Sequence, residues 1–305
     1  MDPMTDYALL PKQPYNFHLS AAIFSGGDPA IRTYNGGSYT QALLIGGRPF
    51  RIRVAQETGS AGLLLSVFPD PVDIGVGESS VRDAVAALFN LYDDLLPFYQ
   101  AVDEDLVMGR LTRDLAGLKV PTTATVFEAL VDSVIEQQIS LSVAHTLQNR
   151  LIKATGTQID DGNSIYYCYP TPVVLASTPP ELFRKCGMSV RKGEYIREIS
   201  GAIVSGALDV EGYRNYSDTG QIVEELVRIR GIGKWTAELT VLRGIHRLDA
   251  FPADDVALRR IIARFYRNGQ NITADEARDI ADQWGHYKGL AAFYLVMADH
   301  LGMSP

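Results

Sequence analysis

The chain has 305 residues, of which 46% are hydrophobic and 21% are charged, the balance of an ordinary globular protein with room for two or three domains. Its net charge of −8 argues mildly against nucleic acid as a partner, although a basic patch can be local. The two cysteines, Cys168 and Cys186, exclude a disulfide framework and a zinc ribbon. No apolar run approaches the roughly 20 residues of a membrane span. Residues 1–13 lack the segments of a signal peptide, so we expect an intracellular protein that does not bind membranes.

The first hundred residues predict a sheet followed by a helix. Residues 39–57 and 61–70 are rich in β-branched and aromatic residues and contain Gly-Gly turn signals. From Ser80 the apolar residues recur at helical spacing. They are Val81, Val85, Leu88, Leu91 and Leu95. The helical pattern continues to about Leu118, and a break follows around Pro121.

Beyond Pro121 the sequence predicts helices almost throughout. Thr125 with Glu128 has the spacing of a capping box, and Ser140 and Thr273 are expected to cap two later helices. We therefore predict an α+β protein, with an N-terminal domain of about 100 residues and a helical region of about 200.

The stretch "RIRGIGKWTAELTVLRG", from Arg228 to Gly244, predicts a tight helical hairpin. Gly231 and Gly233 lie between a helix expected at 217–229 and a second helix from about 234. Glycine accepts unusual backbone angles and lets another molecule approach the main chain. The free N–H groups that begin the second helix form a ready anion site, for which a phosphate diester is the obvious ligand. Nearby positive charge comes from Arg228, Arg230, Lys234, Arg243 and Arg247. The alternative is a helix that ends at a glycine, followed by a short connector.

Five motifs in order resemble the helix-hairpin-helix (HhH-GPD) superfamily of DNA glycosylases, most of all the 3-methyladenine (alkylbase) glycosylase II family. The motifs are "QPYNFHLSAAIFSGGD", "FEALVDSVIEQQISLSVAHTL", "YPTPVVLA", "CGMSVRKGEYI" and the hairpin followed by "FPADD". The resemblance implies a TATA-binding-protein-like antiparallel α/β domain at 1–104 and a helical domain with the hairpin at 122–247. A second helical domain, formed by 105–121 and 248–305, would complete the active-site cleft.

The resemblance assigns the catalytic role to Asp255, the second acid of "PADD". Cleavage of an N-glycosidic bond builds positive charge on the sugar, and a carboxylate can stabilise that charge. Asp254 is expected to be an acid at a helix N-terminus. Spacing alone leaves open that both residues are only helix caps.

Trp235 occupies the position at which strand-nicking glycosylases carry a lysine that forms a Schiff base. Lys234 is one residue away, about 100° around the helix, and is expected to point elsewhere. The resemblance therefore implies a monofunctional enzyme in which Trp235 stacks on the flipped base. A core tryptophan is the alternative. Other base-pocket positions align with Leu239, Val256 and Val296, and nearby aromatic residues that could serve instead are Tyr287, Phe293 and Tyr294.

DNA contacts are expected at the hairpin and at the turn "EQQIS". The hairpin residues are Gly231, Ile232, Gly233, Lys234 and Thr236. Gln138, with Ile139 beside it, aligns with the wedge that fills the gap left by a flipped base, where the best-known bacterial member has leucine. Gln137 and Gln138 could equally form a polar helix end. Arg191 and Lys192 could touch the DNA backbone or be solvated.

Together these expectations describe a monomeric DNA glycosylase of base excision repair that releases alkylated or otherwise damaged purines from double-stranded DNA in the cytoplasm or nucleoid. No cofactor is implied, apart from a possible Na⁺ or K⁺ at hairpin carbonyls near Arg228 and Gly231. The alternatives are an 8-oxoguanine glycosylase, against which the missing lysine counts, and a non-catalytic helix-hairpin-helix DNA-binding protein.

Overall fold

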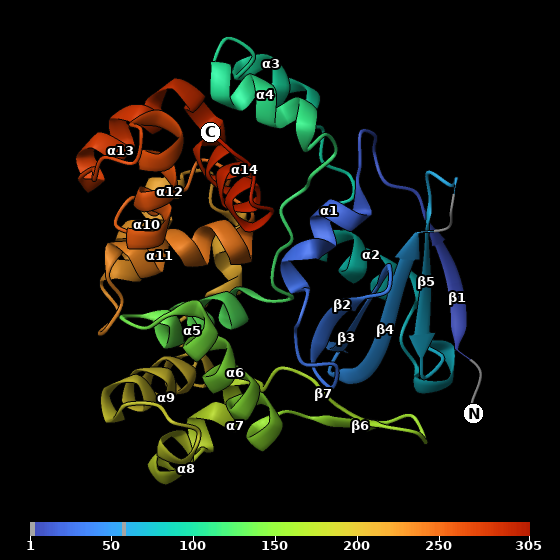
Figure 1. The fold of residues 1–305 in the computed structure, drawn as a ribbon. Coiled ribbons are helices and arrows are strands. Elements are labelled where there is room, and N and C mark those ends of the chain that lie inside the picture. Colours follow the sequence, from blue (N-terminus) through green and yellow to red (C-terminus); the bar gives the residue numbers. More distant parts are fainter. Residues whose placement is uncertain (1–3, 57–58) are drawn as a thin grey trace.

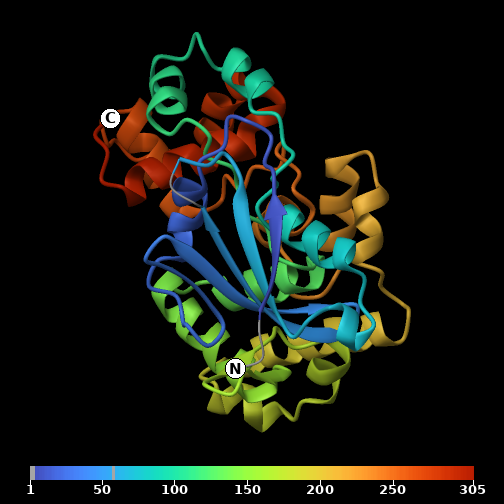
Figure 2. The same ribbon diagram turned by 90° about the vertical axis from the view of Figure 1, so that its right-hand side faces the viewer.

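A computed structural model of the chain describes residues 4–56 and 59–305. An N-terminal sheet lies on one side of the molecule, and two groups of helices lie on the other (Figure 1). Helices α5 to α9 form one group, and helices α3, α4 and α12 to α14 form the other, with α10 and α11 between them. A view turned by 90° has the sheet in front of both groups (Figure 2). The predicted α+β class is confirmed.

The N-terminal sheet has five antiparallel strands in the order β1-β5-β4-β3-β2. Their bounds are Thr5–Leu9 (β1), Arg32–Asn35 (β2), Ser38–Ile45 (β3), Arg48–Gln56 (β4) and Leu63–Phe68 (β5). Gly46 and Gly47 both have positive φ, which suits the tight turn between β3 and β4. The two strand-rich segments of the sequence therefore form the strands that were predicted.

Alternate residues of the central strands point to one buried face, as the period of two requires. Phe50, Ile52 and Val54 are fully buried there and pack with α1 (Phe17–Ala21) and α2 (Glu78–Leu88). Two short 3₁₀ turns, Ala22–Phe24 and Val72–Ile74, complete this region.

The predicted continuous helix after Ser80 is wrong, because α2 ends at Leu88. Asn90 adopts a left-handed conformation (φ 47°), and its side chain donates to the Val120 carbonyl over 2.6 Å. Leu91 then packs in the sheet domain, whereas Leu95 packs among the C-terminal helices. The chain crosses between two hydrophobic cores here, so the apolar spacing continues although the helix does not.

The remaining helices follow in chain order. They are α3 (Leu96–Ala101), α4 (Leu106–Asp114), α5 (Val126–Glu136), α6 (Leu141–Thr155), α7 (Pro172–Ser177), α8 (Pro180–Lys185), α9 (Val190–Val204), α10 (Thr219–Val227), α11 (Lys234–Thr240), α12 (Val256–Tyr266), α13 (Ala274–Ala281) and α14 (Lys288–His300). Glu211–Asn215 and Asp282–Tyr287 are 3₁₀ segments, and a π-helical turn at Val241–Ile245 extends α11.

Three predicted helix caps are confirmed. Thr125, Ser140 and Thr273 each accept a hydrogen bond from the backbone three residues later. Only Thr273 has the full capping box with Glu276. The side chain of Glu128 instead faces Arg32 of β2, at 3.4 Å, and so links α5 to the sheet domain.

One strand pair interrupts the helical region. β6 (Gln158–Asp160) and β7 (Ile165–Tyr167) form a small antiparallel hairpin that packs against β3 and β4. Arg51 of β4 pairs with Asp161 in the hairpin turn and donates to the Tyr166 hydroxyl over 3.0 Å. This hairpin was not predicted.

The larger hydrophobic cores draw on different segments of the chain. One unites the sheet with α1 and α2, a second spans residues 126–250, and a third joins residues 95–120 to residues 251–298. Phe98 of α3, in the segment predicted as part of the first domain, belongs to the third core. In the described part of the chain no helix has the length and apolar character needed to cross a membrane.

Candidate active site

The predicted hairpin is formed by α10 and α11, and its second helix begins at Lys234 as expected. Gly231 has φ +88°, and a Cβ atom there would lie 2.4 Å from the Tyr195 ring, so both conformation and packing require glycine. A Cβ atom at Gly233 would meet nothing within 4 Å, because this residue faces open space. The turn is thus packed on one side and accessible on the other.

The hairpin residues differ in exposure. Gly233 and Lys234 are exposed, whereas the side chains of Ile232 and Thr236 are buried (4% and 2% exposed). The side chains of the latter two are therefore not available to a molecule outside. Gly233 is the N-cap residue of α11, so the first N–H groups of that helix lie next to the accessible side.

Several of the basic residues expected around the hairpin are engaged by groups within the chain. Arg243 pairs with buried Glu136 at 2.7 Å, and Arg230 pairs with Glu198 at 2.6 Å. Arg247 donates to the Tyr216 carbonyl. Among the described residues, Arg228 is exposed and has no carboxylate within 4 Å. The sum of basic residues therefore overstates the positive charge available to a ligand.

Trp235 and Asp255, twenty residues apart in sequence, are brought into direct contact. The indole Nε1 of Trp235 donates to Asp255 Oδ2 over 3.0 Å. Asp255 is the N-cap residue of α12, and its Oδ1 accepts the Leu258 N–H over 2.9 Å. Both residues are half-buried. The carboxylate is thus oriented by a donor on each oxygen and still borders solvent.

Asp254 directly precedes Asp255, the N-cap of α12, and so lies beside the N-terminus of that helix. Asp254 is exposed and pairs with Arg278 of α13 at 3.2 Å. Arg278 also contacts Glu238 of α11 at 3.1 Å and the Phe251 carbonyl at 3.3 Å. Burial raises the pKa of Glu238, although Arg278 opposes the shift. Arg278 thereby ties the loop before Asp255 to the helix that carries Trp235, a link with no sequence signal.

The other residues predicted to line a base pocket differ in their exposure and packing. Leu239 is buried, Val256 is 72% exposed, and Val296 packs at the edge of the C-terminal core. Tyr294 is fully buried and donates to the Leu118 carbonyl over 2.9 Å, so it is a core residue. Tyr287 packs against Phe98, with ring centroids 5.5 Å apart.

The turn after α5 lies beside the hairpin. Gln138 is exposed with φ +58°, a left-handed conformation, and Ile139 is half-buried. Gln137 turns inward and donates to the Gly231 carbonyl at 2.9 Å and to Thr236 Oγ1 at 3.0 Å. Lys192 is not a free cation, since its Nζ donates to the carbonyls of Ile135 and Gln137, both at 2.7 Å. Arg191 is exposed.

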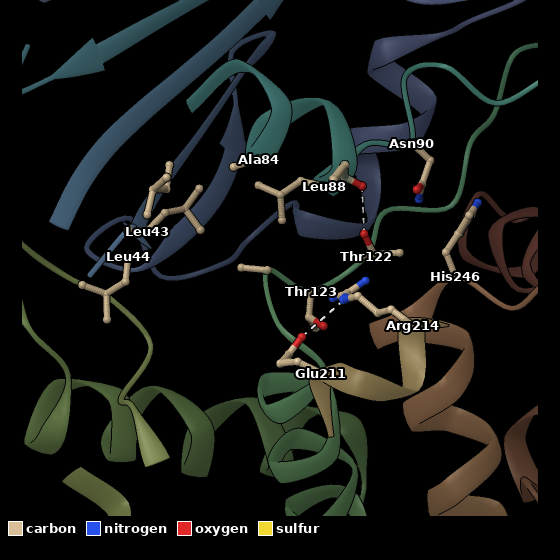
Figure 3. A pocket seen from close by; sticks show the side chains of 14 residues that line it. Leu43, Leu44, Ala84, Leu88, Asn90, Thr122, Thr123, Glu211, Arg214 and His246 are labelled. Atoms are coloured by element: carbon tan, nitrogen blue, oxygen red, sulfur yellow. Dashed lines mark hydrogen bonds and ion pairs between the residues drawn. The ribbon is translucent and has the colours of Figure 1, made fainter. Parts of the chain in front are cut away.

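A cavity of about 480 Å³ lies elsewhere, between the sheet domain and the helical region (Figure 3). Leu43 and Leu88 line one side, and Arg214, paired with Glu211, and His246 line the other. His246 contacts Asp93 at 2.5 Å. Neither Trp235 nor Asp255 borders this cavity, so it is separate from the Trp235–Asp255 pair. Across residues 4–56 and 59–305 no cluster of three or more potential metal-binding side chains occurs.

Comparison with known proteins identifies a matching family and several relatives in sequence. The family model described as "HhH-GPD superfamily base excision DNA repair protein" matches residues 131–286. A DNA-3-methyladenine glycosylase of Bacillus subtilis (strain 168) is 34% identical over 209 residues, which are 68% of each chain. With the next two curated relatives the match spans 61% and 63% of their length.

Solved structures resemble nearly the whole chain. A 3-methyladenine DNA glycosylase from Archaeoglobus fulgidus has a TM-score of 0.85 at 25% identity, over 97% of this chain and 99% of that one. An 8-oxoguanine glycosylase/lyase from Clostridium acetobutylicum has a TM-score of 0.76 over 97% of this chain and 99% of that one. Its identity is only 16%, so this second likeness concerns the fold alone.

Proposed function

Since this chain belongs to the HhH-GPD superfamily of base excision DNA repair proteins, we propose that it is a monofunctional DNA glycosylase. It hydrolyses the N-glycosidic bond of alkylated or otherwise damaged purines that are flipped out of double-stranded DNA, and it leaves an abasic site. The similarity to DNA-3-methyladenine glycosylases supports this substrate class.

The observation that carries the proposal is the contact between Trp235 and Asp255. A half-buried carboxylate, fixed by Leu258 N–H and by the indole N–H, lies next to an aromatic ring and borders solvent. This combination suits a reaction that needs a fixed negative charge beside a bound base.

The chemistry follows from the bond that breaks. As the C1′–N bond of the nucleotide lengthens, its electron pair leaves with the base and positive charge develops on the sugar. Asp255 stabilises that charge electrostatically, because its carboxylate is held in place by the Trp235 and Leu258 N–H groups before the reaction begins. Water then adds to C1′ and releases a proton to solvent. An alkylated purine that carries a positive charge leaves as a neutral base, and its ring stacks favourably on the indole of Trp235.

Trp235 also argues against a lyase step. A Schiff base needs an amine at the sugar, and the nearest lysine in sequence, Lys234, is exposed and lies 3.9 Å from Glu238. We therefore expect no covalent complex with DNA after borohydride treatment. Capture of such a complex would favour the 8-oxoguanine glycosylase/lyase alternative.

DNA binding is assigned to the accessible side of the hairpin and to the turn at Gln138. Main-chain N–H groups at Gly233 and Lys234 are suited to a phosphate. Gln138, exposed and in a left-handed conformation, is the residue proposed to enter the gap left by the flipped base. We also propose that the protein acts as a monomer inside the cell.

A monovalent cation at the hairpin is a further part of the proposal. Gly231 offers a carbonyl oxygen that accepts one hydrogen bond from Gln137 and keeps a second lone pair. Together with the Arg228 carbonyl, this oxygen would hold Na⁺ or K⁺ against a DNA phosphate. Replacing K⁺ by tetramethylammonium at equal ionic strength should then weaken DNA binding.

The test is base release from duplexes that each carry one lesion: 3-methyladenine, 7-methylguanine, hypoxanthine, ethenoadenine or 8-oxoguanine. Wild type, Asp255→Asn and the neighbouring control Asp254→Asn are compared, with and without hot alkali. We expect wild type and Asp254→Asn to release alkylated purine, with strand breakage only after alkali, and Asp255→Asn to be inactive.

Other outcomes would overturn parts of the proposal. Strand breakage without alkali would show a lyase. Release of 8-oxoguanine alone would show a different substrate class. Binding without release of any base would favour the non-catalytic DNA-binding protein.

A further inference from the structure

We propose that Gln137 is a positioning residue that fixes the gap-filling turn at Gln138 to the DNA-binding hairpin, so that both engage the duplex as one rigid unit. The inference rests on the proposed function, because it assigns Gln138 and the hairpin to DNA. It adds a residue that itself touches neither the base nor the phosphate.

The side chain of Gln137 bridges two parts of the hairpin. Its amide nitrogen donates to the Gly231 carbonyl over 2.9 Å and to Thr236 Oγ1 over 3.0 Å. Gly231 lies in the turn, and Thr236 lies in the first turn of α11 and is 2% exposed. Both donor hydrogens of the amide are therefore used, 94 and 99 residues away along the chain.

The main chain of Gln137 is fixed from the opposite side. Lys192 of α9 donates to the carbonyls of Ile135 and Gln137, both over 2.7 Å. These carbonyls belong to the end of α5, where no intrahelical partner exists. Tyr195, one turn later on α9, packs its ring under Gly231. One helix thus supports both the turn and the hairpin.

The contacts of Gln137 and Lys192 determine where the backbone of Gln138 lies. It directly follows Gln137, is exposed, and has a backbone φ of +58°. A residue other than glycine rarely adopts this angle without support from its surroundings. The segment on its other side begins α6, whose N-cap is Ser140. With the chain held on both sides, the backbone of Gln138 is fixed relative to Gly231.

This arrangement has a consequence for base flipping. A phosphate bound at the hairpin and a side chain inserted into the stack must lie at a constant separation, or the gap is not filled as the base leaves. A flexible turn would lose that register and would have to be ordered at each encounter, at a cost in entropy. Loss of the Gln137 bridge should therefore impair opening of a paired base more than the bond cleavage that follows.

The test uses Gln137→Met, which keeps the length and volume of the side chain but removes both donors, and Gln137→Glu, which replaces the donor by a carboxylate oxygen. Gln221→Met, on the exposed face of the hairpin helix α10, is the matched control. Single-turnover release is measured from 7-methylguanine paired with cytosine and from the same lesion opposite a tetrahydrofuran site, where the base is already unpaired. Thermal melting checks that each variant is folded.

We expect Gln137→Met and Gln137→Glu to slow release from the paired lesion about tenfold, as the loss of two hydrogen bonds predicts. Release from the unpaired lesion should stay within about twofold of wild type. Equal losses on both substrates would show a merely structural role, and no loss on either would show that the bridge is dispensable. Both results overturn the inference.

A second measurement needs no hydrolysis. 2-Aminopurine placed next to a tetrahydrofuran site reports insertion of the wedge through its fluorescence. Wild type and Gln221→Met should raise this signal on binding, and Gln137→Met should bind with similar affinity but raise it less. If wild type gives this signal but releases no base, the proposed function fails while the inference stands. If wild type releases base and Gln137→Met matches it in both assays, the inference fails alone.

Discussion

The chain contains two tryptophans, and each donates its indole N–H to an aspartate that caps a helix. Trp235 contacts Asp255, the N-cap of α12, and Trp284 contacts Asp105, the N-cap of α4, both over 3.0 Å. The same local motif therefore occurs twice, once at the proposed active site and once in the C-terminal core.

The two pairs differ in what surrounds the carboxylate. Asp105 accepts three further hydrogen bonds, from two backbone N–H groups of α4 and from the Tyr266 hydroxyl at 2.8 Å, and Trp284 is 1% exposed. Burial, with Asp105 as a second cause, raises the pKa of Tyr266, which keeps this hydroxyl protonated as a donor. Among the residues that the structure describes, Asp255 has one further donor, Leu258 N–H, and its tryptophan is half-buried.

The difference shows how one motif can serve two purposes. A carboxylate whose lone pairs are all engaged stabilises the fold and has nothing left to offer a substrate. A carboxylate with one donor on each oxygen keeps free acceptor capacity toward solvent. The motif alone would not distinguish the two aspartates, but the count of donors does.

The largest expected effect separates the two aspartates by activity. Asp255→Asn should lower the rate of base release by about 10²–10³-fold, because a charge that stabilises the transition state is lost. Its melting temperature should stay close to that of wild type, since asparagine also caps helices well. Asp105→Asn should do the reverse, with lower stability and normal activity per folded molecule. Single-turnover kinetics and thermal melts on both variants would contradict the comparison if the two behaved alike.

Trp284→Phe should cost about 2–3 kcal/mol of stability, because it leaves a cavity in the C-terminal core and removes a donor from Asp105. For a chain of this size that corresponds to a fall in melting temperature of several degrees, with roughly 2–4 °C for each kcal/mol. Base release measured well below the transition should be unchanged. A variant that melts normally but loses activity would place Trp284 in the site instead of the core.

Trp235→Phe should instead lower activity and leave stability nearly unchanged, and its effect in free energy should be smaller than that of Trp284→Phe. The ring can still stack on a base, but the hydrogen bond to Asp255, worth about 1.5 kcal/mol for a charged acceptor, is lost. We expect a fall in the hydrolysis rate of about tenfold with little change in substrate affinity or melting temperature. A rise in the Michaelis constant alone would indicate that the indole serves only to bind the base.

Much of this arrangement could be predicted from local sequence, and the rest depends on distant contacts. The caps at Ser140 and Thr273, the start of α11 and the turn at Gly46-Gly47 follow from residue types that act within four positions. The end of α2 was mispredicted, because the apolar spacing passes from one core to the next without a break.

The candidate site, too, could be predicted only in part, because many of its contacts join residues that are distant in sequence. The resemblance selected Trp235 and Asp255, but it gave no sign that Arg243 and Lys192 bond within the chain. Their partners lie more than fifty residues away, as does the partner of Gln137. Such pairings are tertiary and leave no periodic signal in the sequence.

Asp132 extends the comparison to a carboxylate that has fewer donors and is more deeply buried. It lies on α5, 6% exposed, and accepts one side-chain hydrogen bond, from the Tyr169 hydroxyl at 2.8 Å. Burial and the neighbouring Glu128 raise the pKa of Asp132 to about 8, against the opposing effect of Arg32. A buried carboxyl group with too few hydrogen-bond donors thus retains its proton. The two aspartates that cap helices instead accept hydrogen bonds on both oxygens.

The raised pKa of Asp132 makes the stability of the folded protein depend on pH. The folded state binds the Asp132 proton more tightly than the unfolded state, so the contribution of this group is fully present below about pH 4 and is lost as the pH rises to about 8. Asp132→Asn cannot ionise and keeps an oxygen for Tyr169. Its melting temperature relative to wild type should therefore rise with pH, by at least about 2 °C between pH 5 and pH 8.5. A difference that stays constant over this range would mean that Asp132 is ionised in the folded protein, as Arg32 alone would make it.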